Sequence, residues 1–165
     1  MKKIAIFAIA GLLALFATDG LGRAASRPGG AAASARGNYV AAAIKALPKA
    51  EGGDARAQAF LGFLYEHGRG VPQDYVAAVH WYTCAAEQGH PTAQYLLGLM
   101  YDKGHGIERS DTLAYKWLNL AAAHAPPAAK EYYVRMRDAV AAKLTAAQVA
   151  EAQWLASNFV PKAPW

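Results

Sequence analysis

The chain repeats itself with a period of 36 residues (93 − 57 = 36), and residues 57–86 and 93–122 are identical at eleven aligned positions. Unrelated segments of this alanine-rich composition would share about two or three identities. A period of this length is the signature of an α-solenoid, in which helical units stack in a row. Such a fold presents an extended surface, so the repeat favours binding over catalysis. The identical pairs are Ala57/Ala93, Gln58/Gln94, Leu61/Leu97, Gly62/Gly98, Tyr65/Tyr101, Gly68/Gly104, Gly70/Gly106, Ala78/Ala114, Trp81/Trp117, Ala85/Ala121 and Ala86/Ala122.

Cap and turn residues divide each unit into two helices. Asp54 is a suitable N-cap for a first helix, and Gly68, which can adopt the left-handed conformation, is suited to end it. Asn38, Asp74 and Ser110 stand 36 residues apart (74 − 38 = 110 − 74 = 36), and each offers a side-chain oxygen to free N–H groups. These three residues therefore predict the start of the second helix in three successive units.

Small residues at repeated positions predict close packing. Gly62 and Gly98 lie inside first helices, where glycine costs about 1 kcal/mol relative to alanine. That cost is tolerable if a neighbouring helix approaches closely. Cys84, the only cysteine, aligns with Leu120 and is expected to be a buried apolar side chain. One cysteine cannot form an internal disulfide, so apolar packing has to stabilise the fold.

These positions carry a family resemblance. The pattern comprises Ala57, Leu61, Gly62, Tyr65, Gly68, Gly70, Val71, Asp74, Ala78, Trp81, Ala85, Ala86 and Gly89. It resembles the Sel1-like repeat of bacterial exported proteins, a relative of the tetratricopeptide repeat with two helices per unit. The second copy departs from it at Ile107, Ser110 and Ala125. The resemblance implies an all-α fold, a right-handed α-solenoid of helix-turn-helix Sel1-like repeats over residues 38–137, with full repeats at about 54–89 and 90–125.

The N-terminal segment predicts export. Lys2 and Lys3 precede an uncharged apolar run at residues 4–18, and small residues follow, which is typical of a signal peptide over residues 1–25. A membrane anchor is the alternative, but such a run is shorter than the roughly 20 residues that span a bilayer. We therefore expect a periplasmic or secreted protein with no stable membrane insertion after cleavage. Residues 26–37 lack apolar periodicity and predict a flexible leader.

The C-terminal segment, residues 138–165, predicts a capping helix and a tail. Thr145 and Gln148 form a capping-box pattern, which indicates a helix from residue 146 to about 159. Pro161 follows and cannot continue it. This helix is expected to cover the last repeat, with Trp154 and Phe159 as its packing residues.

No arrangement of residues in the sequence supports catalysis, a metal site or a cofactor. Without residues 1–25 the chain has fourteen basic residues (17 − 3) and eleven acidic ones (12 − 1), a net charge of +3 without the basic stripe that nucleic acids require. The histidines lack metal-ligand spacing, and the glycine turns at residues 68–70 and 104–106 lie between helices and lack the residues of a phosphate loop.

An enzymatic alternative comes from the resemblance alone. Some secreted, cysteine-rich Sel1-like proteins are described as binding penicillin or as weak β-lactamases. Those proteins have disulfides in each repeat, which this chain lacks, and no Ser-x-x-Lys motif occurs after residue 25. A non-enzymatic protein is therefore expected.

The resemblance places the binding site on the concave side, which the first helix of each unit lines. Stripes at spacings of three and four residues remain on these helices once the packing positions are removed. Phe63 and Leu99 are large apolar residues flanked by charges, as a binding site for an apolar side chain requires, although they could also complete the core. The expected partner is a protein or peptide, or alternatively a cell-envelope component such as peptidoglycan held by a structural scaffold. The stripe residues are Arg56, Ala59, Phe63, Glu66, Thr92, Tyr95, Leu99, Asp102, Glu131, Arg135 and Asp138.

Overall fold

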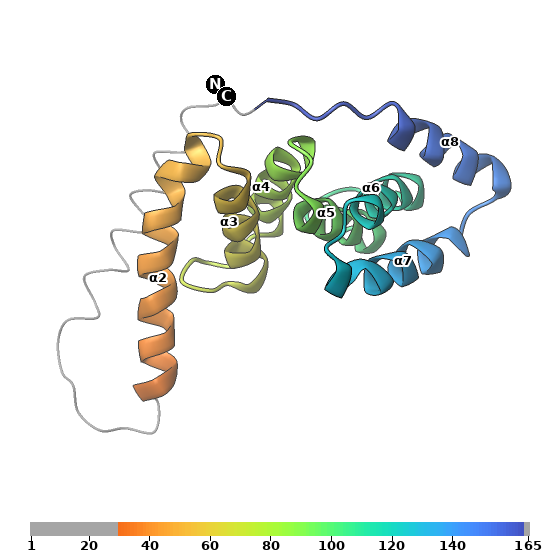
Figure 1. The fold of residues 1–165 in the computed structure, drawn as a ribbon. Helices are drawn as coiled ribbons and strands as arrows, with labels where there is room; N and C mark the ends of the chain where they lie inside the picture. Colours follow the sequence, from red (N-terminus) through yellow and green to blue (C-terminus); the bar gives the residue numbers. More distant parts are fainter. Residues whose placement is uncertain (1–29, 164–165) are drawn as a thin grey trace.

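The computed structural model describes residues 30–163, and this part of the chain is entirely helical apart from its turns and C-terminal tail. The predicted signal peptide lies outside the described residues. The predicted all-α repeat fold is confirmed (Figure 1). The helices described are α2 (Gly30–Glu51), α3 (Ala55–His67), α4 (Tyr75–Glu87), α5 (Pro91–Lys103), α6 (Asp111–Ala123), α7 (Pro127–Ala141) and α8 (Ala146–Ser157).

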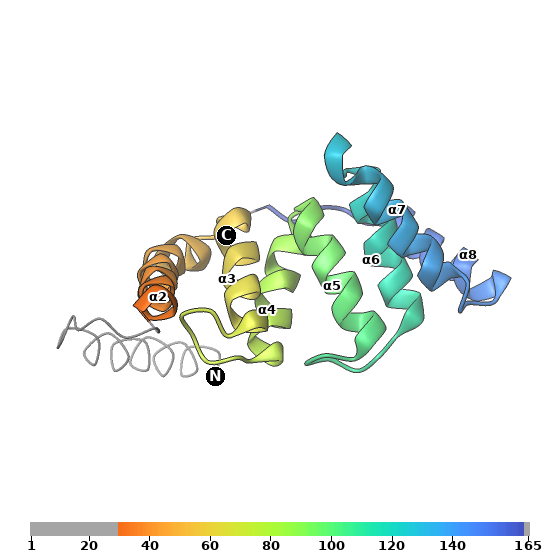
Figure 2. The ribbon, with the colours of Figure 1, turned by 90° about the horizontal axis from the view of Figure 1, so that it is seen from below.

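The helices pack mainly on their neighbours in the sequence. Helices α3 and α4 form one antiparallel pair and α5 and α6 the next, with α2 packed against α3 and α4 against α5. At the other end α6 contacts both α7 and α8. Figure 2 shows the helices in a row, from α2 at one side to α7 and α8 at the other. Within residues 30–163, no helix combines the length and apolar character needed to cross a membrane.

Most of the predicted caps are confirmed. The Asp54 carboxylate accepts a hydrogen bond from the Ala57 backbone N–H at 2.9 Å, and Gly68 ends α3 in the left-handed conformation with φ 62°. Asp74 and Ser110 cap α4 and α6 in the predicted way. The backbone of α2 also passes close to the turn after α3, because a Cβ at Gly70 would lie 2.4 Å from the Tyr39 carbonyl carbon.

The predicted helix start at Asn38 is wrong. Helix α2 begins at Gly30 and runs through Asn38 without interruption, so the predicted flexible leader is helical from residue 30 to residue 37. The cause is local: residues 31–35 contain four alanines, the residue with the highest helix propensity, which lets the helix extend beyond the part that packs.

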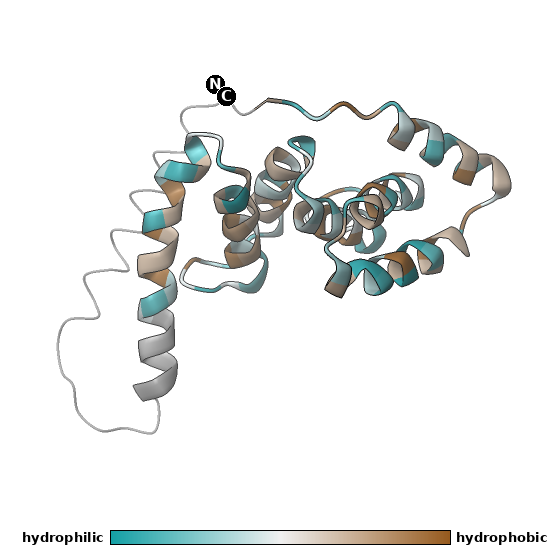
Figure 3. Ribbon diagram, in the orientation of Figure 1, coloured by the Kyte–Doolittle hydropathy of each residue, from teal (hydrophilic) through white to brown (hydrophobic). Residues whose placement is uncertain are grey.

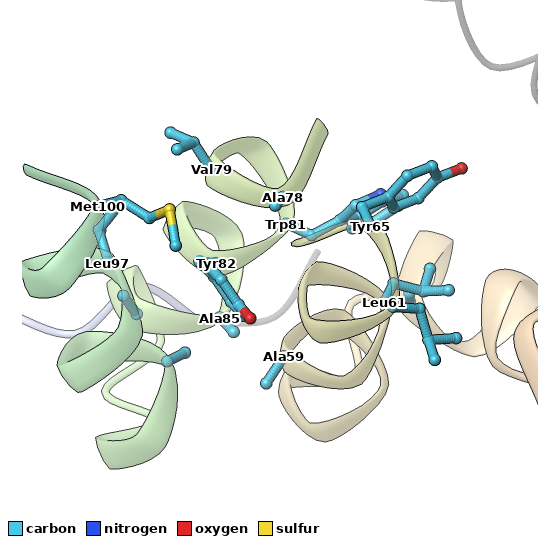
Figure 4. Close-up of a cluster of buried hydrophobic side chains, with 14 of the residues drawn as sticks. Ala59, Leu61, Tyr65, Ala78, Val79, Trp81, Tyr82, Ala85, Leu97 and Met100 are labelled. Carbon is cyan, nitrogen blue, oxygen red and sulfur yellow. The ribbon is translucent and has the colours of Figure 1, made fainter. Parts of the chain in front are cut away.

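The mid-helix glycines allow close approach between the helices of a pair, as predicted. A Cβ at Gly62 would lie 2.5 Å from ring atoms of Tyr82, and one at Gly98 would lie 2.8 Å from Leu118 Cγ. Tyr82 and Leu118 occupy equivalent positions on the second helices, and both are fully buried. Figure 4 shows Tyr82 among the buried side chains of the neighbouring helices. Each glycine therefore makes room for a large core side chain.

Two buried glutamines connect successive units. Gln58 Nε2 donates to the Ala50 carbonyl at 3.0 Å, and Gln94 Nε2 donates to the Ala86 carbonyl at 3.2 Å. Both glutamines are fully buried and stand 36 residues apart (94 − 58 = 36). Gln88 Nε2 donates to Gln58 Oε1 at 2.7 Å, so both polar atoms of the Gln58 amide have hydrogen-bond partners. In the described part of the chain, Gln94 Oε1 is a buried acceptor with no hydrogen-bond donor.

Cys84 is only part-buried, which contradicts the expectation of full burial, and its Sγ lies 3.9 Å from His80 Nε2. Its repeat equivalent Leu120 is 7% exposed. The difference follows from the neighbours: α8 packs on α6, and Leu120 shares a cluster of buried residues with Ala156 of α8, whereas α6 makes no comparable packing on α4 within the described residues.

The C-terminal helix is confirmed, but not both of its packing residues. Thr145 and Gln148 form the predicted capping box, and α8 ends at Ser157. Phe159 packs edge-to-face on Trp117 with ring centroids 5.6 Å apart. Trp154 is 62% exposed, so its prediction as a packing residue is wrong, because the buried residues Ala152 and Ala156 lie on the opposite side of α8.

The tail after α8 runs back along the solenoid toward its first units (Figure 1). The Lys162 backbone N–H donates to the Glu87 carbonyl at 2.7 Å, and the two side chains form an ion pair at the same distance. A Cβ added at Gly89, the glycine that follows α4, would lie 3.6 Å from Pro161 Cγ, so the tail passes close to this turn.

Candidate binding face

The eleven predicted partner-binding residues lie on α3, α5 and α7, and we call this surface the first-helix face. It is not uniformly accessible. Ala59 and Tyr95 are each only 7% exposed, so they support the face rather than form its surface. Their predicted role as partner contacts is thereby corrected, because each is covered by the core. The exposed members are Arg56, Thr92, Glu131, Arg135 and Asp138, and the part-buried ones are Phe63, Glu66, Leu99 and Asp102.

Phe63 has one side in the core and one side toward charged groups. It packs against the cluster of buried residues around α3 and α4. The centroid of its ring also lies 4.4 Å from the centroid of the His67 ring. The Arg69 guanidinium carbon lies 5.0 Å from the same Phe63 centroid. Arg69 Nη1 in turn donates to the Tyr39 hydroxyl at 3.0 Å. The ring therefore completes the core and also forms part of an aromatic and cationic surface.

The two carboxylates of the face are held by different partners. The Tyr82 hydroxyl donates to Glu66 Oε2 at 2.6 Å, and burial followed by this hydrogen bond raises the pKa of Tyr82. In the next repeat Leu118 stands in place of Tyr82 and cannot donate. There Lys143, which follows α7, forms an ion pair with Asp102. Both carboxylates are thus fixed in position before any partner binds.

Tyrosine rings connect α5 to α7. Tyr95 stacks on Tyr133 with centroids 4.4 Å apart and an interplanar angle of 3°. The ring centroids of Tyr132 and Tyr95 lie 5.7 Å apart, and the Arg135 guanidinium carbon lies 5.7 Å from the Tyr132 centroid. Burial raises the pKa of Tyr95, and its interaction with the Tyr132 hydroxyl raises that pKa further. Tyr132 remains 46% exposed at the surface of this cluster.

The sequence did not single out several side chains that complete the face. Tyr132 and Lys143 lie after the two full repeats. Comparison of the repeats therefore could not show whether these positions are used for packing or vary with the partner. Tyr39 and Arg69 belong to a preceding helix and to a turn rather than to a first helix. Tyr39 and Arg69 are 30 residues apart, which does not match the 36-residue period, so comparison of the repeats gave no signal for this pair.

The titratable groups provide no arrangement for metal binding in the described part of the chain, because no three of its His, Cys, Asp or Glu side chains come together as ligands. His90 is instead the N-cap of α5, with its Nδ1 accepting from the Ala93 N–H at 3.3 Å. Burial lowers the pKa of His90, and the nearby Arg56 lowers it further. Burial also raises the pKa of Tyr65 to about 12.

Residues 55–90 and 91–125 each match the family model described as Sel1 repeat. The chain is a Sel1 repeat protein. Each matched repeat begins directly after an N-cap, Asp54 in the first case and His90 in the second. The helix-turn-helix unit seen in the structure is therefore the repeat that the family model describes.

One solved structure supports this assignment. The chain is similar to c5321, a protective antigen of uropathogenic Escherichia coli with a Sel1-like repeat fold, at 29% identity and a TM-score of 0.67. The match covers 93% of this Sel1 repeat protein but only 29% of the E. coli chain. A Sel1 repeat protein of Oxalobacter formigenes is 46% identical over 54% of this chain and 65% of its own, with a TM-score of 0.49. No curated protein sequence matches the chain.

Proposed function

We propose that this Sel1 repeat protein is a non-enzymatic scaffold that binds a protein or peptide along the first-helix face. The observation that carries the proposal is the surface around Tyr132, a half-exposed ring beside the Arg135 guanidinium and supported from below by Tyr95. Aromatic and arginine side chains that are already held in place are the groups that dominate binding energy at protein interfaces. Holding them in place also lowers the entropy lost on binding.

The charges of the face favour a partner that carries both signs. Exposed groups of either sign lie on α7, where Glu131 and Asp138 flank Arg135 along the helix. Figure 3 shows the hydrophilic residues of this helix. A mixed rim of this kind selects a partner by complementary side chains, whereas a uniformly basic face would attract any polyanion.

The compartment that fits the proposal is the periplasm or the cell exterior. The predicted signal peptide supports export, and the E. coli relative is described as a protective antigen. Mass analysis of the native protein tests this part directly: the mature N-terminus should fall between about residues 18 and 26. Native protein that retains Met1 would contradict export by signal-peptide cleavage.

Affinity capture from the native cell envelope tests the binding face itself. The purified wild type should retain a defined protein, and Arg135→Glu should lose it, because the substitution reverses the charge beside Tyr132. Lys130→Glu is the matched control. It makes the same charge change on α7, but lies roughly 140° around the helix from Arg135.

The melting temperatures decide between loss of binding and loss of folding. The proposal requires that Arg135→Glu melts like wild type and that Lys130→Glu keeps the partner. Equal loss of the partner in both variants would instead indicate general charge attraction. If the protein sediments with intact sacculi and Arg135→Glu does so equally, the structural cell-envelope role replaces the peptide-binding one.

A further inference from the structure

A cavity of about 380 Å³ lies between α6, α8 and the C-terminal tail. It shares no residue with the first-helix face. Its size is at the lower end of the range found for ligand sites, about 300–1,000 Å³. The lining residues are Glu87, Lys116, Trp117, Trp154, Leu155, Asn158, Phe159, Val160 and Lys162.

At the mouth of the cavity, two large apolar side chains are left mostly exposed by the part of the chain that the structure describes. Trp154 is 62% exposed and Val160 is 79% exposed, and both line the cavity. The floor is formed by Trp117 and Phe159, which meet edge-to-face. Exposed tryptophan at the rim of a concave, aromatic site is the arrangement found where a partner supplies an apolar side chain.

Most polar groups of the cavity are already paired. Lys162 Nζ lies 2.7 Å from Glu87 Oε2, and Asn158 Nδ2 donates to the Trp154 carbonyl at 2.8 Å. Lys116 differs: its Nζ lies 4.4 Å from the Trp117 ring centroid and makes no ion pair within the described part of the chain. Burial lowers the pKa of Lys116, an effect only partly opposed by Glu87. The cavity therefore contains one partly desolvated cation among aromatic rings.

We propose that this cavity binds an acidic side chain flanked by large apolar side chains of a partner polypeptide. The carboxylate would pair with Lys116, since a partly desolvated ammonium gains more from an anion than an exposed one does. The flanking apolar side chains would cover Trp154 and Val160. A sugar fits less well, because its hydroxyls would be desolvated with few free polar groups to receive them.

A pair of tripeptides tests the proposal on the full-length protein. The probes are acetyl-Leu-Glu-Leu-amide and acetyl-Leu-Gln-Leu-amide, which differ only in the charge of the central side chain. The four tryptophan indole N–H signals in a two-dimensional NMR spectrum report where each probe binds. We expect the acidic peptide to shift the signals of Trp117 and Trp154, to leave that of Trp81 unchanged, and to bind at least about tenfold more tightly than the glutamine peptide.

Two variants assign the effect to this cavity. Lys116→Gln should bring the affinities of the two peptides within about twofold of each other, and Trp154→Ala, a change at an exposed position, should weaken both. Lys45→Gln, on α2, removes a lysine far from the cavity and should change neither. Equal binding of the two peptides by wild type, or no shift at Trp154 up to the solubility limit of the acidic peptide, overturns the proposal. Tighter binding of chitotriose than of the acidic peptide at the same signals overturns it in favour of a glycan site.

Discussion

At the scale of single residues, the two buried glutamines show how one repeat completes a contact that the next leaves open. Gln88 donates to Gln58 Oε1 and also lies 3.3 Å from the Cys84 carbonyl, so it links both groups. The residue 36 positions later (88 + 36 = 124) is His124, whose Nδ1 lies 3.1 Å from the Leu120 carbonyl. The histidine reproduces the contact with the carbonyl but not the one with the glutamine. A buried acceptor without a donor is costly, so this position lowers stability.

His124→Gln should therefore stabilise the protein by about 1 kcal/mol, because the new amide can donate to Gln94 Oε1 as Gln88 donates to Gln58. For a domain of this size, the melting temperature should rise by about 4 °C. His124→Ala is the control, since it removes the imidazole without adding a donor. Thermal unfolding followed by circular dichroism checks the pair, and a glutamine variant that melts no higher than the alanine variant contradicts the argument.

The imidazole cap at His90 predicts a dependence of stability on pH. Nδ1 can accept from the Ala93 N–H only when it carries no proton, and burial lowers the pKa of His90 below its ordinary value of 6.5. The unfolded chain keeps the ordinary value and therefore takes up the proton first as the pH falls. The contribution of this group is complete above pH 6.5 and is lost as the pH falls from there through the folded pKa.

Urea unfolding at about pH 7.5 and about pH 5.5 measures this contribution. We expect the free energy of unfolding to fall more in wild type than in His90→Asn, because asparagine is a strong N-cap that does not titrate. An equal fall in both proteins would show that other groups carry the pH dependence.

At the scale of the helix pair, each glycine and the large residue opposite it set the distance between the helices. In the first repeat Tyr82 packs over Gly62 and extends far enough to reach Glu66. In the second repeat the shorter Leu118 packs over Gly98, and the equivalent carboxylate is paired from outside the repeat. One backbone geometry thus accommodates two different polar arrangements at the first-helix face.

Gly62→Ala should destabilise the protein by about 1–3 kcal/mol, because its Cβ would lie 2.5 Å from the ring of the fully buried Tyr82. Alanine's better helix propensity, about 1 kcal/mol, does not compensate for overpacking of that size. Gly37→Ala is the matched control: Gly37 also lies inside a helix, but a Cβ there meets no atom within 4 Å. The control should be neutral or stabilising, and urea midpoints that fall equally in both variants would exclude packing as the cause.

The sequence predicted the helix boundaries of the two full repeats, whereas the helix start predicted at Asn38 and the burial predicted for several side chains were wrong. Asp74 and Ser110 are different residues at equivalent positions, and both can act as N-caps, which identified the start of the second helix. Asn38 has the right spacing, but the alanines before it allow the helix to continue. Trp154 has no aligned copy, so nothing in the sequence showed which side of α8 it occupies. Burial of Tyr95 was hidden for a similar reason, since it depends on a ring from α7.

At the scale of the whole molecule, the tail alters what would otherwise be a purely sequential stack. Units of a solenoid contact only their neighbours, so stability is approximately a sum over adjacent pairs. Here Phe159 packs on Trp117 of α6, and three residues later the Lys162 backbone bonds to Glu87 at the end of α4. The tail thus connects the closing segment with the second helix of each full repeat. This arrangement should make the two repeats unfold together.

Removal of residues 159–165 tests that coupling by hydrogen exchange and mass spectrometry. Because the deletion takes away contacts to both α4 and α6, we expect faster amide exchange in both helices and loss of a single cooperative transition in urea. Phe159→Ala is the matched comparison, since it keeps the Lys162 backbone bond and should cost about 2 kcal/mol, below the range for a fully buried phenylalanine. Exchange in α4 should then stay closer to wild type than in the truncated chain. If truncation accelerates exchange in α6 and α8 alone, the tail covers the last repeat without coupling it to the first.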